Sequence, residues 1–271
     1  MVVQHNISAM NTNRQLGIST ENLAGHTEKL SSGYKVNKAA DDAAGLTISE
    51  KMRSQIRGLS KASENAQNGI SLIQTAEGAL NETHDILQRM NELSTQAAND
   101  TNTSDDRKAI QSEIDQLTSE IDRIQSTTQF NTMNLLDGSF TNKKLQVGAL
   151  SGHTIDVSIR NMNASSLGVG ALSVDSNTNA GLAMSNIQSA ITQVSELRST
   201  LGALQNRLNH TIKNLDTATE NTQASESRIR DTDMASEMVQ YSATSIIQQA
   251  GQSMLAQANS QTQGVLQLIQ G

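Results

Sequence analysis

The sequence predicts a mainly α-helical fold: an elongated antiparallel bundle of three long helices with a small β-hairpin, and a further helix at each end of the chain. Three observations support this prediction. The 271 residues contain no proline, apolar residues recur at helical spacings through most of the chain, and only four residues are aromatic. Proline removes a backbone donor and clashes inside a helix, so its absence leaves long helices uninterrupted. With so few aromatic side chains, burial must come from narrow aliphatic stripes between helices.

The first helix is predicted by apolar residues that recur every seven positions: Val2, Ala9, Leu16, Leu23 and Leu30. This spacing is typical of an amphipathic helix. Ser31, Ser32 and Gly33 signal its end, and the residues up to 44 read as an irregular connector. Asp41 and Asp42 are expected to cap the next helix, because carboxylates favour a helix N-terminus.

The second helix is predicted by an unbroken heptad series: Met52, Leu59, Ala66, Ile73, Leu80 and Leu87. A helix of about 50 residues is roughly 75 Å long at 1.5 Å per residue. A polar turn follows at 99–106. Alternating spacings of four and three then predict a helix that folds back antiparallel on the long one, through Ile110, Ile114, Leu117, Ile121 and Ile124.

Between residues 128 and 180 the helical period is lost, and glycines interrupt the chain. Leu145 and Val147, then Ile155, Val157 and Ile159, alternate at period two around a turn, which predicts a β-hairpin near 140–165. Helical spacing resumes and predicts a third long helix to about residue 224, marked by Ile187, Val194, Leu201, Leu208 and Leu215.

The last segment places apolar residues at helical spacings again: Ala243, Ile247, Ala250, Met254, Ala258, Val265 and Leu268. From residue 234 to the last residue the only charged side chain is Glu237. A membrane-lying amphipathic helix would carry Lys and Arg on its polar face. The composition favours a helix that is buried against other copies of itself.

Composition excludes several classes of function. The net charge is −7 and no Lys/Arg block occurs, so the sequence lacks the footprint of a nucleic-acid binder. No run of 18 apolar residues predicts a membrane span, and no signal peptide is recognisable, so export would use another route. The histidines are scattered, there is no cysteine, and no phosphate-binding glycine loop occurs. The sequence therefore predicts no enzyme, no metal site and no cofactor.

Several strings carry a family resemblance: His-Asn-Ile-Ser-Ala-Met-Asn-Thr-Asn-Arg at 5–14, Glu-Lys-Leu-Ser-Ser-Gly-Tyr-Lys-Val-Asn at 28–37, Ala-Asp-Asp-Ala-Ala-Gly-Leu at 40–46, Gln-Phe-Asn at 129–131, Asn-Leu-Leu-Asp-Gly at 134–138, and Leu-Ala-Gln-Ala-Asn at 255–259. In this order they closely resemble bacterial flagellin. The match covers about residues 1–140 and 182–271, which is most of the chain.

The resemblance implies a secreted, extracellular subunit that polymerises into the helical filament of the bacterial flagellum, with an export chaperone and a filament cap as further partners. It implies that the two termini pair as coiled helices in an inner core domain, formed by 1–44 and 225–271. Residues 45–224 would form the outer helical domain. The middle of the chain is too short for another sizeable domain, so a minimal two-domain flagellin is expected.

The apolar edges of the two terminal segments predict which parts of the chain mediate assembly. Residues 1–40 and 230–271 each have one apolar edge and are far apart in sequence, so we expect them to be largely disordered until assembly orders them. The candidate assembly residues are Val2, Ala9, Leu16, Leu23, Leu30, Ile247, Ala250, Met254, Ala258, Val265 and Leu268.

Arg89, Leu93 and Gln96 share one helix face and allow two interpretations. In the first, Leu93 continues the apolar stripe while Arg89 and Gln96 form its solvated border or a subunit contact. In the second, implied by the resemblance, these residues and Glu113 bind Toll-like receptor 5 of animal hosts. Asn91 stands where many receptor-stimulating flagellins carry a second arginine, and Ser94-Thr95 replaces a more apolar pair.

The sequence is also compatible with two other functions. A hook-filament junction protein shares the terminal design, although the C-terminal motif favours flagellin. A non-flagellar coiled-coil adhesin or signalling protein would explain the heptads, yet such proteins usually carry more charge than the 17% found here.

Overall fold

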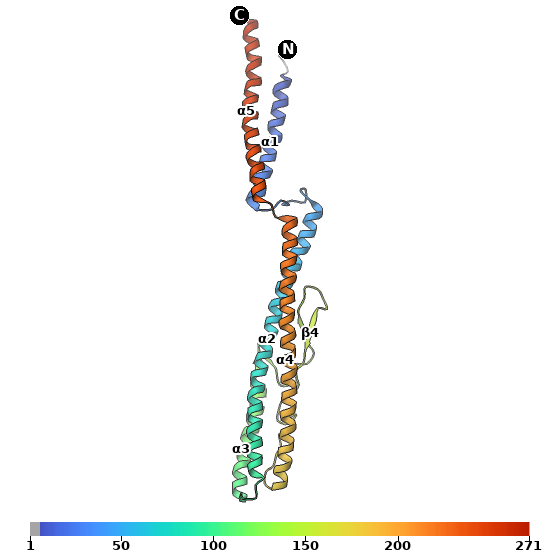
Figure 1. The fold of residues 1–271 in the computed structure, drawn as a ribbon, viewed down its shortest axis with the longest axis vertical. Helices are drawn as coiled ribbons and strands as arrows, with labels where there is room; N and C mark the ends of the chain where they lie inside the picture. Colours follow the sequence, from blue (N-terminus) through green and yellow to red (C-terminus); the bar gives the residue numbers. More distant parts are fainter. Residues whose placement is uncertain (1–5, 271) are drawn as a thin grey trace. The chain divides into compact units, whose positions relative to one another are not determined.

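The computed structural model describes the backbone of residues 6–270 and their side chains, apart from those of residues 262 and 265–270. The fold is mainly helical (Figure 1), as the sequence predicts, and it contains two small pairs of antiparallel strands. The helices are α1 (Ile7–Ser32), α2 (Ala43–Ala97), α3 (Ser104–Thr127), α4 (Asn177–Arg230) and α5 (Met234–Gln270).

The chain divides into two compact units, which we name the terminal unit (Met1–Ser54 and Asn221–Gly271) and the central unit (Gln55–Glu220). The two units divide after Ser54 and after Glu220, whereas the sequence placed the boundaries after residues 44 and 224. The positions differ because the start of α2 and the end of α4 belong to the terminal unit. Helix α4 continues past residue 224 to Arg230. No breaker interrupts 224–230, and Arg228 and Arg230 in the last turn suit the negative end of the helix dipole.

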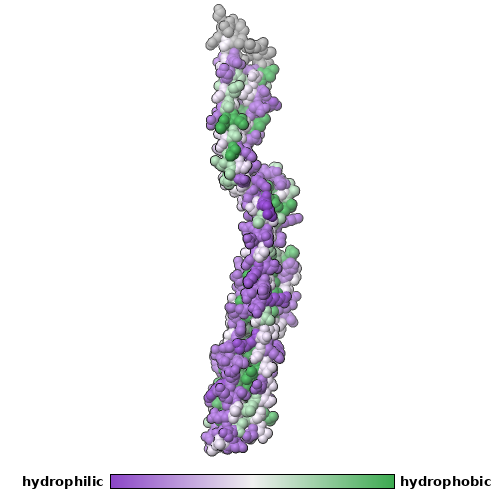
Figure 2. All heavy atoms as spheres, viewed as in Figure 1, coloured by the Kyte–Doolittle hydropathy of each residue, from purple (hydrophilic) through white to green (hydrophobic). Residues whose placement is uncertain are grey.

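The predicted heptads form the core of the central unit. In α2, Ile73, Leu80 and Leu87 are fully buried, and in α4 so are Leu201 and Leu208. Three isoleucines of α3 join the same cluster. The charged and polar residues between these positions stay on the surface, so the viewed face of this unit is mostly hydrophilic (Figure 2). Aliphatic stripes therefore supply most of the burial in this unit.

The predicted hairpin is confirmed, with slightly different bounds. Strands β3 (Lys143–Gln146) and β4 (Thr154–Val157) pair antiparallel, and Leu145 lies opposite Ile155. A second hairpin, β1 (Gln129–Phe130) with β2 (Met133–Asn134), was not predicted. Its two turn residues, Asn131 and Thr132, both have positive φ, which suits the twist of a two-residue hairpin turn.

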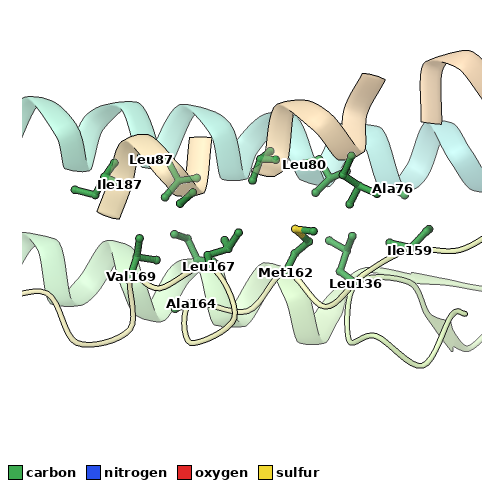
Figure 3. Close-up of a cluster of buried hydrophobic side chains, with 14 of the residues drawn as sticks. Ala76, Leu80, Leu87, Leu136, Ile159, Met162, Ala164, Leu167, Val169 and Ile187 are labelled. Atoms are coloured by element: carbon green, nitrogen blue, oxygen red, sulfur yellow. The ribbon is translucent and has the colours of Figure 1, made fainter. Parts of the chain in front are cut away.

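The segment between the hairpins and α4 adds an irregular layer to the core. Residues that the sequence left unassigned, such as Met162, Leu167 and Val169, are at most 3% exposed. Figure 3 shows them pointing toward Leu80 of α2 and Ile187 of α4. Because this segment has no regular period, its apolar residues form no pattern that a sequence scan detects.

Among the described residues, no helix is long and apolar enough to cross a membrane. Within the same part of the chain, no three His, Cys, Asp or Glu side chains converge in a way that could hold a metal ion.

Candidate functional site

Two short connectors join the terminal helices to the long ones and are hydrogen-bonded to each other. Helix α1 ends at Gly33, whose φ of 75° is left-handed and whose N–H donates to the Lys29 carbonyl at 2.9 Å. The Thr232 N–H donates to the Gly33 carbonyl at 2.9 Å, and Tyr34 forms an antiparallel bridge with Asp231. The residues that follow α1 therefore lie beside the residues that precede α5.

Arg230 reinforces this junction. Its guanidinium lies 4.7 Å from the centre of the Tyr34 ring, and its Nη1 donates to Oε1 of Glu50 at 2.9 Å. The Arg230 side chain is only 12% exposed, so both interactions are shielded from water on one side. The Ser49 hydroxyl donates to the Glu226 carboxylate at 2.9 Å. These contacts fix the start of α2 and the end of α4 to the connectors.

The two expected capping carboxylates have different roles. Asp42 accepts from the Gly45 N–H at 2.9 Å, so it caps α2 as expected. Asp41 instead accepts from the N–H groups of Lys38 and Asn37, and these hydrogen bonds lower the pKa of its carboxyl. Asp41 therefore shapes the connector and does not cap the helix.

Helices α1 and α5 run antiparallel in one register. Asn6 Nδ2 donates to the Ala258 carbonyl at 3.0 Å, and Gln248 Nε2 donates to the Thr20 hydroxyl at 3.2 Å. His26 Nδ1 lies 2.6 Å from Glu237 Oε1. As the residue number rises along α1, the partner's number falls along α5. In this structure the two terminal helices therefore pair with each other within one chain.

The seam between these helices is half polar. The half-buried positions follow heptad spacing in both helices: Ala9, Thr12, Leu16, Ser19, Leu23, His26 and Leu30 in α1, and Tyr241, Thr244, Gln248, Gly251, Leu255 and Ala258 in α5, with buried Glu237 at its start. A Cβ on Gly251 would lie 3.5 Å from Leu16 Cδ1, an ordinary van der Waals contact, so α1 and α5 lie close together at this level. No side chain of α1 is fully buried. Pairing within the chain therefore leaves much apolar surface uncovered.

A second face of α5 carries large apolar side chains in contact with solvent. We name it the α5 stripe, and it consists of Val239, Ala243, Ile246, Ile247, Ala250 and Met254. Val239 is 69% exposed, Ile246 66%, Ile247 58% and Met254 61%. The stripe is uncharged, because Glu237, the one charged residue of α5, is buried in the seam. Figure 2 shows hydrophobic residues on the terminal helices.

The structure separates the predicted assembly residues into two groups. Ala9, Leu16, Leu23, Leu30 and Ala258 belong to the seam between α1 and α5. Ile247, Ala250 and Met254 belong to the exposed α5 stripe. Val2 lies outside the described residues, as do the side chains of Val265 and Leu268.

Exposed apolar surface is concentrated in the terminal unit. Among the described residues of this unit, Val36 is the only apolar side chain that is fully buried. On α1, Ile7 is 71% exposed and Met10 is 66% exposed. A soluble subunit buries such side chains or uses them as an interface. The terminal helices therefore carry apolar surface that pairing within one chain does not bury.

The receptor candidates form a smaller, charged patch on α2 and α3. Arg89 Nη2 donates to Glu113 Oε1 at 2.9 Å, and its Nη1 donates to Glu92 Oε2 at 3.1 Å. The hydrogen bond to Glu113 is the main cause that raises the pKa of Arg89. Gln96 is exposed on the same face, whereas Leu93 is only 2% exposed and packs in the core. Arg89, Glu113 and Gln96 are therefore accessible to a partner, and Leu93 supports them from below.

Sequence reasoning did not find the polar contacts of the terminal unit. The pairing of Arg230 with Tyr34 and Glu50 joins residues that are far apart in sequence, and no local spacing marks it. The α5 half of the seam does leave a signal. Glu237, Thr244, Gly251 and Ala258 recur every seven residues, but they do not form an apolar series.

Comparisons with known proteins agree with this geometry. Residues 3–141 match the family described as bacterial flagellin N-terminal helical region, and residues 184–269 match the bacterial flagellin C-terminal helical region. The chain is 55% identical to a flagellin of Halalkalibacterium halodurans over 271 residues, covering 99% of this chain and 100% of the relative. It is 48% identical over 286 residues to a flagellar filament 31.3 kDa core protein of Treponema maltophilum, with 100% of both chains covered.

Among solved structures, a crystal structure of Bacillus cereus flagellin is similar at a TM-score of 0.51 and 32% identity. The similarity covers 56% of this chain and 88% of that chain. The family assignment rests on sequence, because family models match both ends of the chain and the relatives match over their full length. The chain therefore belongs to the bacterial flagellin family, whose members are structural subunits of the flagellar filament.

Proposed function

We propose that the paired terminal helices drive polymerisation of this flagellin, and that the α5 stripe is buried against terminal helices of neighbouring copies in the filament. The observation that supports this most directly is the exposed, uncharged α5 stripe, which contrasts with the buried aliphatic core of the central unit. Burying a Val, Ile or Met side chain contributes about 1.5–3 kcal/mol. Several such side chains in each subunit, repeated along a lattice, provide the free energy for assembly.

The polar seam fits the expectation that the ends become ordered during assembly. In an isolated chain, α1 and α5 gain few fully buried contacts to offset the entropy of ordering more than 60 residues, roughly 1–2 kcal/mol for each backbone unit. Neighbouring copies would supply the missing contacts. In this proposal the terminal segments 1–44 and 225–271 form the inner core domain of the filament.

The proposal also includes the three-helix bundle, export with a chaperone, and delivery to a filament cap. The antiparallel arrangement of α2, α3 and α4 in one bundle is supported by the single core cluster that these helices share. The protein would be exported before assembly, and the exposed stripe is a surface that an export chaperone would shield. The filament cap would then receive subunits whose α5 stripe is not yet covered by neighbouring copies.

Comparison of free subunits with filaments tests the assembly surface. Purified protein should extend filament seeds into filaments that are visible by negative-stain electron microscopy. Limited proteolysis of the free subunit should cut within α1 and α5 at least about tenfold faster than proteolysis of the filament, because burial against neighbours removes local opening. Cleavage sites in the exposed turn at 150–153 serve as the internal reference. Equal cleavage of α1 and α5 in both states would contradict the proposal.

A second function is supported by the charged patch on α2 and α3. We propose that Arg89, Gln96 and Glu113 contact Toll-like receptor 5, with Leu93 holding their helix in place from the core. The Arg89 guanidinium is fixed by two carboxylates while its side chain stays 50% exposed. An arginine that is held in one geometry loses less entropy when it binds a partner, and arginine is common among interface hot spots.

Arg89→Ala should weaken binding to the purified receptor ectodomain by about tenfold or more, as expected for one interface hot spot. The fold should be unchanged, because exposed ion pairs contribute little to stability. Surface plasmon resonance with the monomeric protein measures the affinity. Arg123→Ala is the matched control, since Arg123 pairs with Glu120 on α3 and is 61% exposed. Equal affinities of the two variants would exclude this patch as the contact.

A further inference from the structure

Methionine is distributed unevenly between the two units. Within the central unit, Met90 is fully buried, Met162 is 3% exposed, and Met133 on β2 is 41% exposed. In the described part of α1 and α5, all four methionines are exposed, with Met10 at 66% and Met254 at 61%. The side chains that a solvent-borne oxidant reaches most easily are therefore those of the terminal helices.

Met10 and Met254 lie at the same level of the antiparallel helix pair. The contact between Asn6 and Ala258 lies to one side of this level, and the approach of Leu16 to Gly251 lies to the other. Met10 has Ile7 and Arg14 around it on the outer face of α1. Met254 ends the described part of the α5 stripe. At this level, two thioethers thus form part of the proposed assembly surface.

We propose that Met10 and Met254 are oxidation sites that control whether a free subunit can join the filament. This inference rests on the proposed role of the terminal helices in assembly. A thioether sulfur attacks the O–O bond of a peroxide and takes one oxygen atom. Methionine and hydrogen peroxide give methionine sulfoxide and water, so sulfur is oxidised and the peroxide is reduced.

Oxidation of the thioether removes the apolar character that the assembly surface needs. A sulfoxide is a polar group and a strong hydrogen-bond acceptor, whereas the position requires an apolar side chain that neighbouring copies can bury. Free subunits expose both sulfurs to oxidant, and subunits within the filament cover them. Oxidation therefore stops further growth while it spares filament that is already assembled.

Seed extension after peroxide treatment tests this inference. Free subunits are treated with hydrogen peroxide, cleared of oxidant and added to untreated seeds, and peptide mass spectrometry follows each methionine. We expect sulfoxide at Met10 and Met254, and extension slowed by about tenfold or more, as the loss of one buried Met side chain implies. In filaments treated in the same way, both residues should oxidise about tenfold more slowly.

The variant Met10→Leu/Met254→Leu keeps two apolar side chains that peroxide does not oxidise, so it should extend seeds at the same rate before and after treatment. Met133→Leu is the matched control, because Met133 is 41% exposed but lies on β2 in the central unit. This control should be inhibited as strongly as the original chain. Inhibition of the double variant, or normal extension by the oxidised original chain, would overturn the inference. If untreated filaments leave α1 and α5 open to protease, the proposed assembly surface is wrong instead.

Discussion

Removal of residues 235–271 is expected to abolish polymerisation and to leave the central unit folded. The truncation deletes α5, and with it the whole α5 stripe and the partner of the α1 seam. Every fully buried apolar side chain of the core clusters lies between Leu59 and Leu215, so the central unit keeps all of them. Sedimentation and negative-stain microscopy, with seeds present, measure the polymer.

The stability of the central unit provides the control for this truncation. Denaturant unfolding followed by circular dichroism should show a cooperative transition whose midpoint is close to that of the full chain. The helical signal should fall only by the contribution of the terminal helices. Filaments formed by the truncated chain would refute the assembly proposal. Loss of the cooperative transition would show that the terminal helices are needed to fold the central unit.

The central helices could be predicted from sequence because each presents one apolar stripe to one core. Ile73, Leu80 and Leu87 recur every seven residues, and the structure buries all three. A period of seven has one explanation when the rest of the helix is polar. Leu167 and Val169 are buried equally well, but they lie in an irregular segment where neighbouring residues have unrelated directions. Only the folded chain shows that they reach the core.

The terminal helices were harder to predict in detail, because α5 carries small or apolar residues on more than one face. Met254 and Ala258 are both at helical spacing from Ala250, yet Ala258 faces the seam and Met254 faces solvent. Periodicity identifies the helix but does not say which face pairs within the chain and which face remains for other copies. The polar contacts of Asn6, Gln248 and His26 decide this, and they depend on the register of two segments far apart in sequence.

The distinction between the two faces of α5 leads to the sharpest test of the assembly surface. The double substitution Ile247→Glu/Met254→Glu places two carboxylates on the α5 stripe and removes two of its apolar side chains. We expect the concentration needed for filament growth to rise by about a hundredfold or more, because two burials of about 1.5–3 kcal/mol each are lost. Both side chains already face solvent in the free subunit, so its free energy of unfolding should change by less than about 0.5 kcal/mol.

Gln249→Glu/Gln252→Glu is the matched control for the stripe substitution. It adds the same two negative charges to exposed positions of α5, but these positions lie outside the stripe and no apolar side chain is removed. If charge alone disturbed assembly, both double variants would fail to grow. If the stripe is buried between copies, only Ile247→Glu/Met254→Glu should fail, and the glutamine variant should form filaments at nearly the original concentration. Normal filaments from the stripe variant would mean that another surface holds the subunits together.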